Sequence, residues 1–258
     1  MCEMLAGSFN KPISPSYPLK YFEKRDKDNP DGWGLGYFPD NSVELIKEPV
    51  KAEESKLYSF FSNYQETRSK IFITHLRGAT VGELSHQNTH PFKRELNGNG
   101  YIFAHNGTLN DIKTKNLKRY FPIGDTDSEY AFCYLLDQLK DKLRNQYLKN
   151  NLGFLRNLFT EINKYGQFNC VISQGQYLFT YHDMKGYKGL HYLDPKQIKP
   201  NLKEKTLPKE IKRYLKNLKK LKGKIIATKP ILMKDKWKKF DKGEYTVIKK
   251  GKFILREK

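Results

Sequence analysis

The chain begins Met1-Cys2-Glu3-Met4-Leu5, a cysteine at the start of a run that reads as a strand to about residue 9. Removal of Met1 would leave Cys2 carrying both a thiol and a free α-amino group. An α-amine titrates near ~8, close to the thiol, so the neutral amine can take the thiol proton directly or through a water. Terminal amines activate nucleophiles in this way. Cys2 is therefore a candidate nucleophile, although a cysteine after Met1 also occurs by chance.

Three polar motifs further along the chain each adjoin a segment with a clear secondary-structure pattern. They are THLRGAT at 74–80, FAHNGT at 103–108 and GDTDSE at 124–129. The first two follow apolar runs that read as strands. The third opens a segment whose apolar residues recur near helical spacing. The motifs thus lie at the ends of regular elements, where functional side chains are commonly placed.

Together with Cys2, with NTHPF at 88–92 and with DGWGLGY at 31–37, these motifs resemble the class II glutamine amidotransferases. Those enzymes belong to the N-terminal nucleophile hydrolases, and the chain is most similar to their compact stand-alone branch, which includes a γ-glutamyl amidohydrolase of ergothioneine biosynthesis. The resemblance implies an α+β fold, a four-layer αββα sandwich with two sheets stacked between helical layers. It also implies that residues 1–258 form a single domain, with the motifs in residues 2–135.

The resemblance assigns roles to residues that the reaction needs. Thiol attack on an amide creates a tetrahedral oxyanion, which requires preorganised hydrogen-bond donors. By resemblance, the Asn106 side chain and the Gly107 N–H supply them. The competing interpretation of this pair is an ordinary Asn-Gly turn.

Two charged residues hold the ends of the substrate in the related enzymes. By resemblance, Arg77 binds the α-carboxylate, because a guanidinium matches a carboxylate in two-point geometry. Asp127 occupies the position that pairs with the α-ammonium. The same segment also reads as a helix start, with Thr126 as the cap and Glu129 closing a capping box.

The remaining candidates are substrate-binding residues of lower rank: Thr80, His75, His90 and Trp33, the last as a pocket wall. A histidine in such a segment is more often a hydrogen-bonded structural residue than a proton shuttle. The histidines lack the companion cysteines or helical spacing of a metal site, so no metal is expected. The resemblance implies no organic cofactor either.

The composition of the chain limits where the protein can be located and whether it can form disulfides. We expect a cytoplasmic protein, because no apolar run is long enough to span a membrane and no secretory signal opens the chain. Three irregularly spaced cysteines argue against a disulfide framework. Cys133 and Cys170 fall in apolar segments and are expected to be buried.

Periodicity predicts strands near 33–38, 43–47, 70–76 and 100–105, and helices near 52–65, 126–143 and 151–164. Two hairpins are expected as well. The first joins 170–173 to 177–181, and the second joins 245–248 to 253–255. There is no internal repeat.

The net charge of +20 is concentrated in residues 184–258, which hold 25 Lys or Arg and 7 acidic residues. Between Lys209 and Lys224, apolar residues at helical spacing alternate with lysines. This is either a solvated face or a docking surface for an acidic protein, an anionic substrate or nucleic acid. Lysine dominance and the absence of a nucleic-acid motif argue against nucleic-acid binding. One departure from the family is Thr228-Lys229, where Ser-Glu is common.

The sequence therefore predicts a cysteine-dependent amidohydrolase that acts on the γ-amide of glutamine or of a γ-glutamyl compound through a thioester at Cys2. Two alternatives stay open. The chain could be a glutaminase subunit that supplies ammonia to a separate synthetase, since no ammonia-consuming motif is present. It could also be a non-catalytic binding module, against which the intact set of Cys2, Arg77, Asn106, Gly107 and Asp127 argues.

Overall fold

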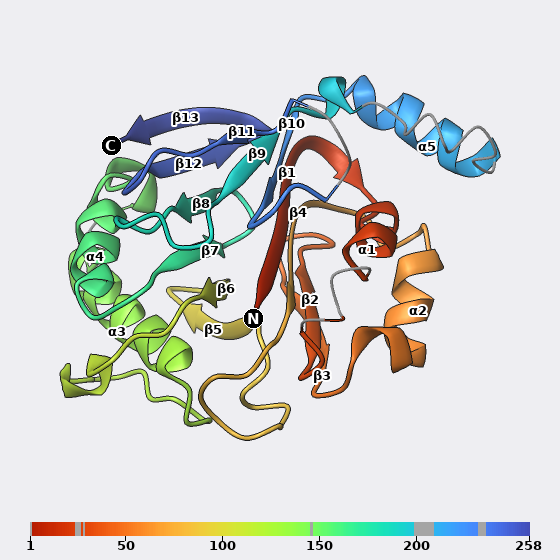
Figure 1. The fold of residues 1–258 in the computed structure, drawn as a ribbon. Coiled ribbons are helices and arrows are strands. Elements are labelled where there is room, and N and C mark those ends of the chain that lie inside the picture. The colour runs from red at the N-terminus through yellow and green to blue at the C-terminus, as the bar shows by residue number, and fades with distance from the viewer. Residues whose placement is uncertain (1, 24–26, 28, 145–146, 199–208, 232–235) are drawn as a thin grey trace.

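In a computed structural model of the protein, two antiparallel sheets are stacked face to face and helices cover their outer faces (Figure 1). The structure describes residues 2–23, 27, 29–144, 147–198, 209–231 and 236–258, without the side chains of 210 and 211. This is the expected α+β, four-layer αββα sandwich. Its layers explain why the sequence alternates strand-like and helix-like segments.

The first sheet has seven strands in the order β11-β9-β10-β1-β4-β2-β3. Its strands are β1 (Glu3–Ile13), β2 (Trp33–Tyr37), β3 (Glu44–Glu48), β4 (Ser69–Leu76), β9 (His191–Leu193), β10 (Gly223–Ala227) and β11 (Lys238–Lys239). The second sheet has six strands in the order β13-β12-β8-β7-β6-β5. Its strands are β5 (Phe92–Leu96), β6 (Asn99–Asn106), β7 (Asn169–Ser173), β8 (Leu178–Tyr181), β12 (Tyr245–Lys249) and β13 (Lys252–Glu257).

Helices α1 (Ser16–Phe22), α2 (Lys56–Asn63) and α5 (Lys209–Lys219) lie on the outer side of the first sheet, and α3 (Asp127–Lys142) and α4 (Phe154–Asn163) cover the second (Figure 1). Each outer interface has its own apolar core, because alternate residues of a strand point to opposite faces. A third core, which includes Met4, Ile73 and Ala104, fills the space between the sheets.

The sequence-based elements are largely confirmed. The strands expected near 33–38, 43–47, 70–76 and 100–105 are present, as are both hairpins. Helix α2 is shorter than the expected 52–65, because Ala52–Glu54 forms a separate 3-10 turn before Ser55 caps the helix. Periodicity missed α1, β5, β10 and the short strands β9 and β11, which are brief segments without a clear pattern.

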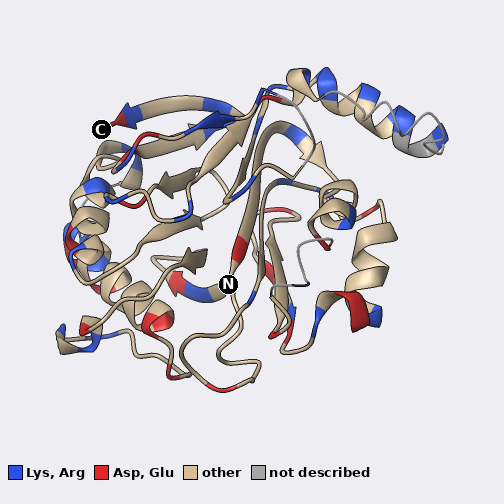
Figure 2. Cartoon of the chain, in the orientation of Figure 1, with Lys and Arg blue, Asp and Glu red and all other residues tan. Residues whose placement is uncertain are grey.

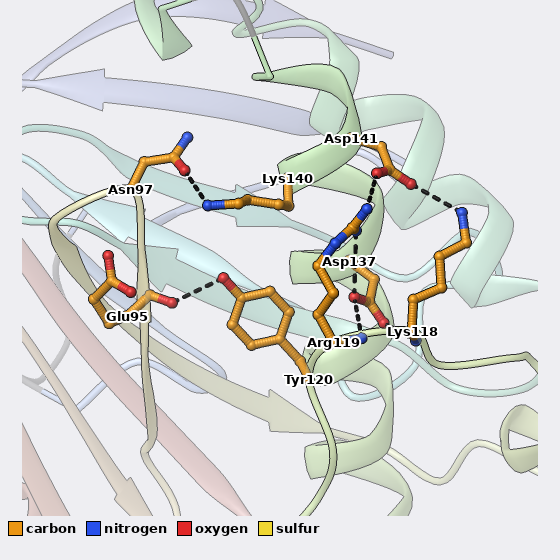
Figure 3. Close-up of polar contacts among 8 residues, drawn as sticks. All are labelled: Glu95, Asn97, Lys118, Arg119, Tyr120, Asp137, Lys140 and Asp141. Atoms are coloured by element: carbon orange, nitrogen blue, oxygen red, sulfur yellow. Dashed lines mark hydrogen bonds and ion pairs between the residues drawn. The ribbon is translucent and has the colours of Figure 1, made fainter.

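The long connection between β6 and α3 is fixed to the outer face of α3 (Figure 3). The buried carboxylate of Asp137 accepts hydrogen bonds from the backbone N–H groups of Lys118 and Arg119 at 2.7 and 2.9 Å. The side chains of the same two residues bind Asp141, and the Tyr120 hydroxyl donates to the Glu95 carbonyl at 2.9 Å. These contacts hold in place the segment that follows the FAHNGT motif.

Candidate active site

Cys2 lies directly before β1, at the end of the first sheet where β4 also ends. The register pairs Glu3 with Leu76, so Cys2 falls next to the residues that follow β4. Its sulfur is 3.3 Å from the carbonyl oxygen of Gly78 and 3.4 Å from the Gly78 nitrogen. Burial raises the pKa of the Cys2 thiol, while the Gly78 N–H and the cations of Lys188 and Arg77 act in the opposite direction. The resting sulfur is therefore a hydrogen-bonded thiol held by backbone.

Asn106, the last residue of β6, connects the second sheet to Cys2. Its side-chain amide donates to the Cys2 carbonyl at 2.6 Å. An amide nitrogen carries two hydrogens, so one N–H of Asn106 remains for another acceptor. The contact spans the gap between the sheets and places an Asn donor beside the thiol-bearing residue.

Gly107 has φ of +153°, a conformation that favours glycine. A β-carbon at this position would lie 2.0 Å from the Gln167 carbonyl oxygen, so a larger residue cannot fit without moving backbone. Among the hydrogen bonds of the described residues, none uses the Gly107 N–H. The Asn-Gly pair is therefore more constrained than an ordinary exposed turn.

Arg77 follows β4 and is buried. Its guanidinium donates to the carbonyl oxygens of Val81, Gly82 and Glu83 at 2.9 to 3.1 Å, which curls the loop after β4 around it. A guanidinium has five N–H groups, so it retains donors beyond these three contacts. Burial lowers the pKa of Arg77, but the group stays charged because its ordinary pKa is so high.

Asp127 is the first residue of α3 and is also buried. Its carboxylate accepts from the backbone N–H groups of Leu109 at 2.6 Å and Ser128 at 2.9 Å. Asp127 thus ties the start of α3 to the segment that follows Gly107. A carboxylate has further lone pairs with which to accept from a ligand.

The expected cap of α3 is present, but the capping box is only half formed. The Thr126 hydroxyl accepts from the Glu129 N–H at 3.2 Å. The Glu129 carboxylate does not return to Thr126. It accepts from the Gly124 N–H at 2.7 Å and pairs with Arg94 at 2.5 Å, because a buried carboxylate gains more from a guanidinium partner.

His75 and His90 lie beneath this site, between the sheets. Their rings stack with centroids 4.3 Å apart, and His75 Nε2 is 3.2 Å from the His105 carbonyl oxygen. Burial lowers the pKa of His75 to about 3 and the pKa of His90 well below its ordinary value. His75 Nδ1 and both ring nitrogens of His90 have no hydrogen-bond partner in the described part of the chain. Both rings are neutral near pH 7.

Thr80, another predicted substrate contact, lies in the loop after β4. Its hydroxyl is 3.4 Å from the hydroxyl of Thr108.

The structure does not place Trp33 where the sequence suggested. Trp33 pairs with Leu76 in the first sheet, and both side chains point to the outer, helix-covered face. The Trp33 ring is fully buried edge-on against Tyr58 of α2, and its nitrogen donates to Glu48 at 3.2 Å. Gly34, its neighbour, faces inward, where a β-carbon would lie 2.2 Å from the His90 carbonyl oxygen. Trp33 is a core residue, and the expectation of a pocket wall was wrong.

The turn between β8 and β9 also borders the site, although none of the sequence motifs lies in it. Burial raises the pKa of the Cys2 thiol, and the cation of Lys188 in this turn acts in the opposite direction. The Tyr187 carbonyl accepts from Asn169 Nδ2 at 2.6 Å, and Asn169 is the cross-strand neighbour of Asn106. The only signal in the sequence is a pair of glycines, Gly186 and Gly189, that marks a turn.

The unusual Thr228-Lys229 pair has an evident partner. The Thr228 hydroxyl donates to the carboxylate of Glu3, and the Lys229 ammonium is 3.0 Å from the same carboxylate. Glu3 directly follows the candidate nucleophile. The reversed charge at residue 229 is therefore balanced by an acid within the same site region.

Two further features bear on the chemistry. Within the described ranges, no group of three or more His, Cys, Asp or Glu side chains is arranged to hold a metal ion. Over the same residues, no helix has both the length and the apolar character needed to cross a membrane. Cys133 and Cys170 are buried, as expected, whereas Cys2 is partly exposed.

The fold is that of the N-terminal nucleophile hydrolases, and comparison with known proteins gives the family. The sequence model of the class-II glutamine amidotransferases matches residues 1–258. The chain therefore belongs to the class-II glutamine amidotransferases, a family of enzymes.

Individual relatives agree. The chain is 41% identical over 263 residues to an uncharacterized protein of Methanocaldococcus jannaschii, covering 100% of this chain and 72% of the relative. A crystal structure titled as a "predicted glutamine amidotransferase" from Pseudomonas aeruginosa is 26% identical, with a TM-score of 0.67, covering 98% of this chain and 100% of that one. Glutamine phosphoribosylpyrophosphate amidotransferase of Bacillus subtilis is 15% identical, with a TM-score of 0.65, and matches 99% of this chain and 49% of its own; this likeness concerns the fold alone.

Proposed function

We propose that the protein hydrolyses the γ-amide of glutamine or of a γ-glutamyl compound through a thioester at Cys2. One observation carries the proposal: the Asn106 side chain, from the second sheet, is held 2.6 Å from the Cys2 carbonyl oxygen at the start of the first sheet. A candidate nucleophile and a candidate oxyanion donor are thereby fixed side by side. The reaction class is that of the family to which the chain belongs.

The proposed chemistry begins when Met1 is removed, a residue outside those that the structure describes. The freed α-amine takes the thiol proton, and the sulfur of Cys2 bonds to the γ-carbon. The negative charge on the former carbonyl oxygen is met by the unused N–H of Asn106 and the N–H of Gly107. The carbon–nitrogen bond then breaks, and the amine leaves with the proton that the α-amine held.

Water completes the cycle. It adds to the thioester carbonyl, the same two donors stabilise the second tetrahedral intermediate, and the carbon–sulfur bond breaks to release glutamate and restore the thiol. The lowered pKa of His75 supports the terminal amine as the base, because a histidine that binds protons only near pH 3 is a poor acceptor at neutral pH. No step in this scheme requires a metal or an organic cofactor.

The two charged groups at the α-carbon of the substrate are assigned to two buried side chains of opposite charge, Arg77 and Asp127. Arg77 would bind the α-carboxylate with the N–H groups that its loop contacts leave unused, and Asp127 would accept from the α-ammonium. Both residues are fixed by backbone contacts before any ligand binds. Side chains that are already ordered before substrate binds lose little further entropy on binding, which favours correct orientation of the reacting amide. Thr80 stands at the edge of the same region and is proposed as a weaker contact.

The alternative is that the ammonia passes to a separate synthetase, since the sequence shows no ammonia-consuming motif. An experiment that separates the two is incubation with glutamine and a panel of γ-glutamyl amides, with Cys2→Ala as the control. A hydrolase with its own substrate should process one γ-glutamyl amide far better than glutamine. An ammonia donor should prefer glutamine. Equal turnover by Cys2→Ala would contradict the proposal in either form.

A further inference from the structure

The backbone around the candidate oxyanion donor Gly107 is supported by a second stretch of backbone. We call residues 105–109 the oxyanion segment and residues 166–169 the support segment. The Gln167 carbonyl accepts from the ring nitrogen Nε2 of His105 at 2.9 Å, and the Gln167 N–H donates to a backbone carbonyl of the oxyanion segment at 3.0 Å. The support segment therefore binds the oxyanion segment on both sides of Gly107.

The two segments are closest at Gly107 itself. The space that a β-carbon would need there is filled by the Gln167 carbonyl oxygen, which would lie 2.0 Å from it. This oxygen confines the Gly107 peptide, so a displaced Gln167 would let that peptide rotate. Oxyanion stabilisation depends on donors that are aimed before the reaction begins. The direction of the Gly107 N–H therefore depends on what holds the support segment.

Asp183, which lies shortly after β8 and is buried, holds the support segment. Its carboxylate accepts from the Phe168 N–H at 2.9 Å and from the Asn163 side-chain amide at 2.8 Å. That amide nitrogen also donates to the Gly166 carbonyl at 2.7 Å. The Asp183 N–H in turn donates to the side-chain oxygen of Asn169 at 2.9 Å. Asp183 thus makes contact with both ends of the support segment, directly or through Asn163.

The second carboxylate oxygen of Asp183 fixes the turn that follows it. It accepts from the N–H groups of Lys185 and Tyr187 at 2.8 and 3.1 Å. Burial raises the pKa of Asp183, but the hydrogen bonds that it accepts outweigh burial and bring the pKa below its ordinary value. The side chain is therefore a charged acceptor at neutral pH, and charge-assisted hydrogen bonds are stronger than neutral ones.

Packing alone does not hold the support segment. The Phe168 side chain is anchored in the apolar core beneath α3 and α4, but Gly166 and Gln167 border a cavity of about 750 Å³. Backbone with few buried apolar contacts has low local stability. The hydrogen bonds that reach this part of the segment are therefore needed to keep Gln167 against Gly107.

We propose that Asp183 is a positioning residue that aims the Gly107 N–H at the oxyanion. It acts through the support segment and is not itself a catalytic residue. The inference rests on the proposed function and adds to it a buried acid that lies outside every sequence motif. Loss of the Asp183 carboxylate should slow amide hydrolysis more than it weakens substrate binding, because the oxyanion exists only during the reaction.

The matched variants are Asp183→Asn and Asp137→Asn. Asp137 is also a buried carboxylate that accepts from backbone N–H groups, but it holds Lys118 and Arg119 and not the support segment (Figure 3). Asp183→Asn replaces one accepting oxygen by a donor, so it should lower kcat about 10- to 100-fold with little change in KM, as expected for a misplaced catalytic group. Asp137→Asn should lose stability but keep the wild-type kcat.

Two further measurements separate positioning from damage to the fold. Each kcat is divided by the fraction of Cys2 that an electrophilic glutamine analogue labels at completion, so that unfolded protein does not count. Iodoacetamide alkylates the thiol by displacing iodide and forms no oxyanion. Asp183→Asn should therefore keep the wild-type rate of iodoacetamide alkylation at Cys2 while its amide hydrolysis slows.

A second variant covers the case in which Asp183→Asn shows no cooperative unfolding in urea. Asn163→Ala removes the amide that binds both Asp183 and the Gly166 carbonyl, so it loosens the support segment while the carboxylate stays in place. It should show the same pattern, with a lowered kcat, a similar KM and an unchanged rate of iodoacetamide alkylation.

Three results would overturn the inference. The first is a kcat for Asp183→Asn that equals the kcat of Asp137→Asn. The second is a fall in the iodoacetamide rate as large as the fall in kcat, which would mean that Asp183 holds the thiol and not the oxyanion donor. The third is a raised KM at unchanged kcat, which would place the effect on substrate binding. A wild type that hydrolyses neither glutamine nor any γ-glutamyl amide would overturn the proposed function, and the inference with it.

Discussion

The site around Cys2 and helix α5 both carry positive charge, but they hold it in opposite ways. At the site, the Arg77 guanidinium is buried and bound by three backbone carbonyls, and Lys188 is half-buried in a strained turn. On α5, Tyr214, Leu215 and Leu218 pack against the apolar core beside the first sheet, while Lys212 and Lys216 are exposed. Figure 2 shows Lys and Arg residues distributed along α5. The two regions differ in whether their positive charges are buried or exposed, and not in the amount of charge.

The contrast explains why net charge is a poor guide to function in this chain. Exposed charges interact weakly because water and salt screen them. Buried charges are expensive unless they are held by hydrogen bonds, so each one that persists has a defined geometry. We therefore expect substitutions at the site to change rate or affinity and matched substitutions on α5 to change neither.

The largest difference should appear between two asparagines. Asn106→Ala removes one oxyanion donor and should reduce kcat by roughly 10² to 10³, with a smaller effect on KM. Asn217→Ala, on the exposed face of α5, is the matched control and should retain wild-type kinetics. Steady-state kinetics on the best substrate from the γ-glutamyl panel would measure both. Equal rates for the two variants would remove Asn106 from the mechanism.

A smaller effect should appear in the pH dependence of stability. Burial lowers the pKa of His75, His90 and His105 in the folded protein, to about 3 for His75. Below the ordinary histidine pKa of 6.5, the unfolded chain binds protons that these buried rings cannot. The free energy of unfolding should therefore fall as pH drops from 6.5 toward 3, by about 1.4 kcal/mol per pH unit for His75, and His90 and His105 should add to the fall in the same direction.

Urea unfolding just above pH 6.5 and one unit below it would measure this slope. The double variant Lys212→Gln, Lys216→Gln should unfold within about 0.5 kcal/mol of the wild type and show the same slope, because exposed charges contribute little. A flat profile in the wild type would mean that the buried histidines take up protons in the folded state. A changed slope in the lysine variant would mean that α5 participates in the titration.

The positions of the main candidate residues in the fold were predictable because these residues fall where regular elements begin or end. Cys2 precedes a strand, Arg77 follows one, Asn106 ends one and Asp127 opens a helix, and the register of β1 with β4 brings the first two together. Local periodicity is enough to locate such ends. The four-layer fold itself came from the family resemblance, since strand count does not specify how sheets stack.

The sequence could not show which face of a sheet a side chain occupies, or which residues contact each other across the sheets. Trp33 and Gly34 are neighbours in one string, and only the parity of β2 decides that the ring points outward and the glycine inward. Lys188 is far from every motif along the chain. The turn that carries it is joined to the second sheet by the Asn169 to Tyr187 hydrogen bond, which no local pattern predicts.

The central claim is that Cys2, as the first residue of the mature chain, is the nucleophile. Intact-mass analysis of active protein, before and after treatment with an electrophilic glutamine analogue, tests it most directly. We predict a mass that lacks Met1 and gains one label, located on Cys2 and absent from the buried Cys133 and Cys170. An active enzyme that quantitatively retains Met1, or labelling that persists in Cys2→Ala, would contradict the account.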